Sequence, residues 1–150
     1  MRSNDPRAPV GGDREMRQPN RQPTGVDTQP SAVMNYARRF VGLRYLWGGV
    51  SPWGFDCSGL VHFSYRMAGV VVPRDASAQH AASIPVPLGD EEPGDLYFFA
   101  NDDGRVTHVG FVAYDEKMLH APEGGGLIEE APLSPERHRS LIGAGRLITV

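Results

Sequence analysis

The feature that most constrains the fold is a change in the spacing of apolar residues part-way along the chain. In its first folded part, apolar side chains recur every three or four positions, as they do along one face of a helix. One helix is predicted from Ser31, as N-cap, to Gly42, and a second from about Cys57 to Gly69. Further along, polar and apolar side chains alternate, which is typical of strands. This change of period predicts an α+β domain.

The alternating part divides into short runs that are separated by turn residues. Five strands are predicted, at 96–100, 106–114, 117–121, 126–131 and 145–150. The sequences NDDG and DE read as hairpin connections between the first three. A further short helical turn is expected from Asp75 to about His80. We therefore expect N-terminal helices and a mainly antiparallel sheet of about five strands, with the helix that opens at Cys57 packed on that sheet.

The first thirty residues differ from the rest in composition. They contain five prolines, three glycines and only five residues of the hydrophobic class. So little apolar surface cannot offset the entropy that is lost on ordering. Residues 1–30 are predicted to be a disordered polar tail or linker, and residues 31–150 to be one domain.

Charge and hydropathy exclude several classes of function. The net charge is −3, so no basic surface points to nucleic acid. No apolar run reaches the roughly 18 residues of a membrane span, and the N-terminus lacks the pattern of a signal peptide. The chain is expected to be soluble, without a nucleic-acid partner or a membrane span.

Cys57 is the only cysteine, so it cannot form a disulfide within the chain. It follows a loop rich in glycine and tryptophan and opens a predicted helix. The backbone N–H groups and dipole at a helix start stabilise a thiolate, which suits a nucleophile. A buried, unreactive cysteine is the alternative, and position alone does not separate the two.

Two histidines are candidates for the base that a nucleophilic cysteine needs. His108 lies in the strand VTHVGFVAY, and His120 lies in the next strand. A hairpin that turns at about Asp115 and Glu116 would bring His120 near residue 110 and hence near His108. The two rings could then share a hydrogen bond that fixes the tautomer of one of them. Each histidine alone fits a structural role equally well.

Four blocks of sequence, DCSGL, GDLYFF, HVGFV and LHAP, occur together in this order. With YLWGGVSPWGFDCSGL and PRDASAQ, they resemble the signatures of the NlpC/P60 family of papain-like cysteine peptidases. The resemblance covers about residues 32 to 150. It implies a papain-like α+β fold and an enzyme that cuts bacterial cell-wall peptides.

The resemblance implies a catalytic role for three residues. Cys57 is the implied nucleophile, His108 the general base and His120 the orienting third residue. The hydroxyl of Tyr45 is expected near the thiol as a polar or oxyanion-side donor, together with the backbone N–H of Cys57 or Ser58. The implied reaction is hydrolysis of a stem peptide between D-γ-glutamate and meso-diaminopimelate or lysine, through an acyl-enzyme.

Further residues are expected around the substrate. The segments SPWGFDCSGL and PRDASAQ are similar to a subgroup, the dipeptidyl-peptidase VI-like enzymes, that often cuts short peptides with a free N-terminal L-alanine. This similarity implies that Asp56 and Ser58 bind the amine, although Asp56 could equally be a helix cap. Trp47 could line the groove or pack on the core, and Ser77 could border the groove.

Other readings remain open at this stage. A papain-like amidase or acyltransferase, a non-catalytic wall-binding module, and a zinc site formed by the cysteine and the histidines are the alternatives. No cofactor and no metal are expected, and a monomer is expected. The expected partners are peptidoglycan stem peptides or free muropeptides. The expected location is the cell envelope or the outside, reached by a leader or a partner, with cytoplasmic recycling of wall peptides as the alternative.

Overall fold

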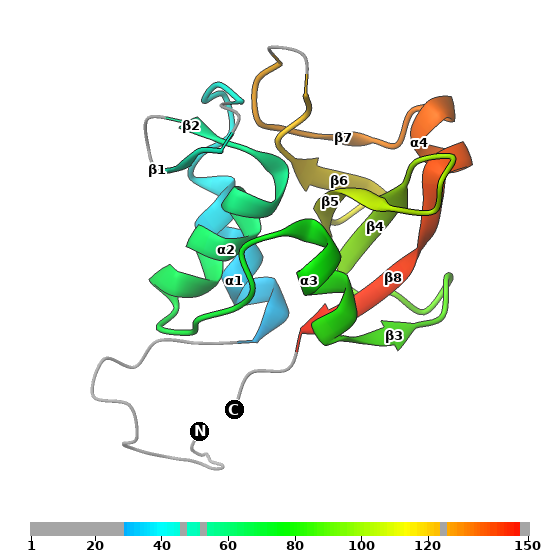
Figure 1. The fold of residues 1–150 in the computed structure, drawn as a ribbon. Coiled ribbons are helices and arrows are strands. Elements are labelled where there is room, and N and C mark those ends of the chain that lie inside the picture. The colour runs from blue at the N-terminus through cyan, green and yellow to red at the C-terminus, as the bar shows by residue number, and fades with distance from the viewer. Residues whose placement is uncertain (1–28, 46–47, 52–53, 124–125, 148–150) are drawn as a thin grey trace.

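The computed structural model describes residues 29–45, 48–51, 54–123 and 126–147. It shows a curved antiparallel sheet with three of its helices gathered on one side and a short fourth helix elsewhere (Figure 1). The helices are α1 (Pro30–Arg38), α2 (Cys57–Met67), α3 (Ala76–Ala82) and α4 (Pro135–Ser140). The prediction of a disordered tail falls almost wholly on residues outside the described ones and stays a prediction.

The main sheet has six strands in the order β3-β8-β4-β5-β6-β7, and all neighbours are antiparallel. The strands are β3 (Ser83–Val86), β4 (Leu96–Ala100), β5 (Val106–Val112), β6 (Lys117–His120), β7 (Glu129–Pro132) and β8 (Leu141–Leu147). A separate two-stranded ribbon is formed by β1 (Val50–Ser51) and β2 (Gly54–Phe55). The edge strands of the main sheet are β3 and β7, and each contains a proline in its ladder, Pro85 and Pro132.

Helix α2 carries the stripe that joins the helical layer to the sheet. The residues predicted for this stripe, Leu60, Val61, Ser64, Tyr65 and Ala68, are all buried. They lie in one hydrophobic core with residues of α1 and with the helix-facing side chains of the central strands. A smaller second core lies between α4, the loop that precedes it and the other face of the sheet. Packing on both faces fixes β5 and β6, the strands that carry the two histidines.

The predicted α+β class is confirmed, and several element bounds differ from expectation. Helix α1 begins at Pro30 with Gln29 as its N-cap, so Ser31 lies inside its first turn. Strand β3 was not predicted, because SIPV is short and contains a proline. Strand β8 begins at Leu141, four residues before the predicted start, because two glycines conceal its alternation.

No helix in the described part of the chain is long and apolar enough to cross a membrane. The longest of them, α2, has 11 residues.

Candidate active site

Cys57 is the first residue of α2, and its neighbour Asp56 is the N-cap. The Asp56 carboxylate accepts a hydrogen bond of 2.6 Å from the N–H of Gly59, which fixes the helix start. The thiol is almost fully buried, with 7% of Cys57 exposed, and its sulfur lies 4.0 Å from the carbonyl oxygen of Thr107. The thiol therefore lies against β5, at the residue that precedes His108 in the chain.

The pKa of the Cys57 thiol is raised to about 11, chiefly because the thiol is buried. The backbone N–H groups of Val109 and Ser58 lower this pKa, and the charges of Asp56 and Glu123 raise it. This outcome differs from the expectation that the helix start alone makes the thiol an anion. Burial outweighs the amide groups, so the free thiol is protonated at neutral pH and needs a base.

The base candidates are brought together by the hairpin between β5 and β6. Phe111 pairs with Leu119 in this hairpin, and the register continues to place Gly110 opposite His120. A Cβ built at Gly110 would lie only 2.8 Å from the Cβ of His120, so glycine permits the close approach of the strands. The turn at Asp115 and Glu116 has φ of 60° at both residues, as a two-residue hairpin with a type I′ turn requires.

The two histidine rings are hydrogen-bonded, as expected from the sequence. Nε2 of His108 lies 2.8 Å from Nδ1 of His120. Nε2 of His120 lies 2.9 Å from a carboxylate oxygen of Glu129, a partner that sequence reasoning missed. Nδ1 of His108 is buried and has no hydrogen-bond partner among the described residues. His108 is 1% exposed and His120 5%, so the pair is shielded from water.

Burial lowers the pKa of both histidines. The pKa of His108 is well below its usual value of 6.5, first because of burial and then because of the charges of Arg137 and His120. Burial also lowers the pKa of His120, while the hydrogen bond and charge of Glu129 raise it. Both lowered pKa values favour neutral rings at pH 7, and Nδ1 of His108 is the ring nitrogen of the pair that has no hydrogen-bond partner among the described residues.

A second polar group surrounds the start of α2. One guanidinium nitrogen of Arg74 lies 2.9 Å from Asp56, and the other donates to the hydroxyl of Ser58, also over 2.9 Å. The buried side chain of Gln79 donates to the backbone carbonyls of Ser58 and Pro73, which ties the Arg74 loop to α2. Neither Arg74 nor Gln79 was among the residues expected around the substrate from the sequence. The segment PRDASAQ contains both, and its spacing is the signal that could have indicated them.

The remaining predicted residues lie at different distances from this centre. Tyr45 is half-buried, and its pKa is raised to about 12 by burial and then by the Cys57 charge, which places its hydroxyl in the field of the thiol. Ser77 is exposed on α3, and no contact joins it to the cysteine or the histidines in the described part of the chain. The prediction for Trp47 lies outside the described residues.

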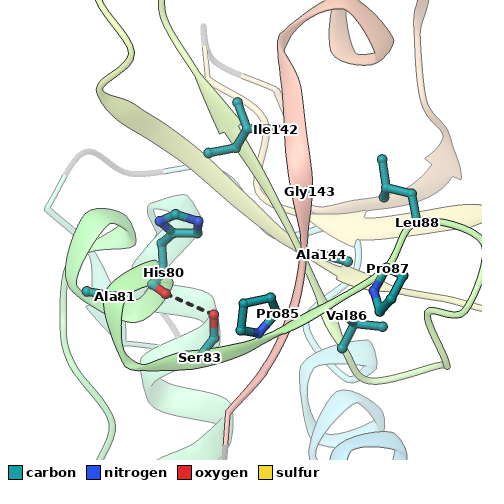
Figure 2. A pocket seen from close by; sticks show the side chains of 10 residues that line it. All are labelled: His80, Ala81, Ser83, Pro85, Val86, Pro87, Leu88, Ile142, Gly143 and Ala144. Carbon is teal, nitrogen blue, oxygen red and sulfur yellow. Dashed lines mark hydrogen bonds between the residues drawn. The ribbon is translucent and has the colours of Figure 1, made fainter.

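A metal site and a separate pocket would be the two other kinds of site in the described residues. No group of three or more His, Cys, Asp or Glu side chains there could hold a metal ion. Figure 2 shows an open pocket between α3, β3 and β8, with His80 at one end and Leu88 at the other. None of the predicted site residues lines this pocket.

A cysteine at a helix start beside two bonded histidines on a sheet defines a papain-like arrangement. Residues 42–146 match the model of the NlpC/P60 family. The chain belongs to the NlpC/P60 family, as its sequence blocks suggested.

Named relatives agree with this assignment. The chain is 41% identical over 123 residues to a gamma-D-glutamyl-L-lysine dipeptidyl-peptidase of Bacillus subtilis, a match that covers 80% of this chain and 42% of that protein. A crystal structure of an NlpC/P60 family protein from Bacillus cereus is 35% identical, with a TM-score of 0.78, and the match covers 83% of this chain and 42% of that one. A peptidoglycan hydrolase structure from Mycobacterium tuberculosis is 29% identical, with a TM-score of 0.67, over 79% of this chain and 64% of that one. The chain thus spans less than half the length of the first two.

Proposed function

We propose that this chain is a cysteine peptidase that hydrolyses peptidoglycan stem peptides after D-γ-glutamate, with Cys57 as nucleophile. The observation that carries the proposal is the unpartnered, buried Nδ1 of His108, whose strand contacts the Cys57 sulfur. A general base needs a ring nitrogen that is free to take the thiol proton, and the unpartnered Nδ1 of His108 would be that nitrogen once it reaches the Cys57 sulfur. The family assignment and the names of the relatives support the same reaction class.

The reaction follows from these groups. His108 takes the thiol proton, and the Cys57 sulfur attacks the peptide carbonyl carbon. The C–N bond breaks, and the His108 imidazolium gives its proton to the leaving amine. His108 then activates a water that hydrolyses the thioester, which releases the acid and restores the thiol. Backbone N–H groups in the first turn of α2, with the Tyr45 hydroxyl, would stabilise the oxyanion.

The proposed substrate is a short peptide that begins with L-alanine and D-γ-glutamate. The dipeptidyl-peptidase name of the Bacillus subtilis relative supports a substrate with a free N-terminus. The charged cluster of Arg74, Asp56 and Ser58 lies beside the thiol, where such a substrate would place its polar end. The diamino acid after the cut bond is meso-diaminopimelate or lysine, and we place the enzyme where wall peptides occur, at the cell envelope.

Asp56 is the proposed partner of the substrate ammonium, although it already has four contacts within the chain. It accepts from the N–H groups of Gly59 and Gly48, from Arg74 and from Ser58. The Ser58 contact is the longest, at 3.4 Å, and is the one that an ammonium would replace. Ser58 would then turn its hydroxyl toward the substrate.

The first prediction tests the nucleophile with defined muropeptides. Wild-type protein should release L-Ala-D-γ-Glu, identified by mass spectrometry, and Cys57→Ala should release none, because no other described thiol is present. Cys57→Ala should keep a thermal midpoint within a few degrees of wild type, since alanine keeps the Cβ and only one sulfur atom is lost.

Control variants separate the two histidines in the same assay. His108→Ala should cost several orders of magnitude in kcat/KM, whereas His120→Gln keeps a hydrogen-bonding group and should retain measurable activity. Intact hydrolysis by Cys57→Ala would exclude a cysteine peptidase. Hydrolysis of a different amide bond, or transfer of the acyl group to an acceptor other than water, with the γ-glutamyl bond left intact, would favour an amidase or acyltransferase.

A further inference from the structure

We propose that Glu129 is a positioning residue that sets the tautomers of His120 and His108, so that His108 presents an unprotonated Nδ1 to the thiol. The inference rests on the proposed function, because it concerns the same cysteine and histidine pair. It assigns a role to a carboxylate that does not touch the reacting atoms.

Glu129 lies on the edge strand β7, directly opposite His120 in the ladder. Its carboxylate oxygen is 2.9 Å from Nε2 of His120. The Glu129 side chain is about half exposed, whereas His120 is almost completely buried. Glu129 therefore connects a water-shielded pair of rings with the solvent at the edge of the sheet.

The direction of the hydrogen bonds follows from the carboxylate. An ionised carboxylate only accepts hydrogen bonds, so Nε2 of His120 must carry the hydrogen. Nδ1 of the neutral His120 is then an acceptor, and Nε2 of His108 must donate to it. His108, neutral as well, keeps its lone pair on Nδ1. One carboxylate thus fixes both rings in the form that can take a proton from Cys57.

Without the carboxylate, the opposite arrangement becomes available. Nδ1 of His120 could then carry the hydrogen and donate to Nε2 of His108. His108 would then carry its own hydrogen on Nδ1, so this nitrogen could not accept the thiol proton. The two arrangements contain the same ring-to-ring hydrogen bond, so the pair alone does not select between them.

Two charged side chains, Arg137 and Glu129, influence whether the histidine pair can take a proton. Arg137, from α4, disfavours a proton on either ring, and Glu129, from β7, favours one on His120. When His108 takes the thiol proton, Arg137 opposes the new positive charge, and Glu129 favours a positive charge on the pair. Glu129 stabilises that charge through His120, as the third residue of a hydrogen-bonded triad does.

The tautomers can be read directly from nitrogen-15 NMR of the histidine side chains at neutral pH. Wild-type protein should show both rings with the hydrogen on Nε2. Glu129→Ala and Glu129→Gln should show a mixture or a reversal, because an alanine accepts nothing and an amide can also donate. Glu130→Gln is the matched control, because Glu130 is the next residue on β7 and pairs with Arg38. Loss of the Glu130 carboxylate should leave both histidine tautomers unchanged.

Reaction of Cys57 with iodoacetamide, followed against pH, provides a second measurement. Loss of the Glu129 carboxylate should move the rise in rate to higher pH and lower the rate at neutral pH by about tenfold, as expected for one charge-assisted hydrogen bond. Glu130→Gln should follow the wild-type profile. A mere loss of stability would lower the thermal midpoint without moving this profile.

Neither measurement uses a peptide substrate, so the two proposals can fail separately. Unchanged Nε2 tautomers and an unchanged alkylation profile in Glu129→Ala would overturn the positioning role. The expected changes in a protein that cuts no muropeptide would support the positioning role and overturn the proposed function instead.

Discussion

At the scale of single residues, Asp56 shows how much one carboxylate does in this site. It caps α2, binds Arg74 and accepts a hydrogen bond from the N–H of Gly48. It makes all these contacts while it directly precedes the nucleophile Cys57 in the chain. The cap and a charge near the thiol were both predictable from the position of Asp56 before Cys57. The ion pair with Arg74 was not, because it joins residues 18 positions apart whose approach depends on the loop before α3.

Asp56→Asn separates capping from charge, since asparagine is an equally good N-cap. We expect wild-type protein to prefer free L-Ala-D-γ-Glu-diaminopimelate over its N-acetylated form. Asp56→Asn should lower that preference by roughly ten- to a hundredfold in kcat/KM, the worth of one charge-assisted contact. Parallel kinetics with the two peptides measure this ratio.

Asp56→Ala is the control for capping, because it should also lose about 1 kcal/mol of stability. Equal turnover of the free and acetylated peptides by the wild-type protein would return Asp56 to the role of a helix cap.

At the scale of elements, the β5–β6 hairpin determines which histidine atoms meet. A two-residue turn at Asp115 and Glu116 would by itself pair Val112 with Leu119, whereas the strands pair Val112 with Met118, so the turn does not give the exact register. The closeness of His108 and His120 could be predicted from the sequence. Glu129 could not, because it reaches His120 across the β6–β7 pairing, whose connection is long and offers no fixed turn length. Helix α4, which brings Arg137 toward the rings, was missed because its six residues have no buried face.

Gly110→Ala tests the close approach of the two strands. The added methyl would lie 2.5 Å from the Met118 sulfur and 2.8 Å from the His120 Cβ, so we expect β6 to move away and the ring-to-ring hydrogen bond to lengthen. We expect a loss of about 1 to 3 kcal/mol in stability and at least a tenfold loss in kcat/KM. Chemical denaturation and peptide hydrolysis measure the two effects.

Val106→Ala, on the same strand, is the matched control for this substitution. It removes volume from a partly buried side chain without crowding β6, and it should cost stability with little loss of activity. Full activity in Gly110→Ala would show that the histidine pair tolerates a wider spacing than this register provides.

At the scale of the whole molecule, the buried histidine pair links folding to pH. Both rings have a lowered pKa in the folded state, so the unfolded chain binds more protons below its usual histidine pKa of 6.5. Stability must therefore fall as the pH falls below this value. Glu130, whose pKa is lowered from 4.5 by Arg38, adds to the loss only at more acid pH.

We accordingly expect the thermal midpoint to decrease between about pH 7 and about pH 5, before most carboxylates titrate. The double variant His108→Gln, His120→Gln should show a flatter profile over this interval, because it has no buried imidazole to keep neutral. Calorimetry of both proteins across the interval measures the difference. Parallel profiles would assign the pH dependence to other groups.

The prolines of the two edge strands have a consequence for how the domain behaves among its neighbours. An open sheet edge is a template on which another chain can add a strand, and this is a common route to aggregation. Pro85 and Pro132 lie within the ladders of β3 and β7 and have no N–H to offer such a strand. Both ends of the six-stranded sheet are therefore blunted, so the domain can be crowded at high concentration without its sheets joining edge to edge.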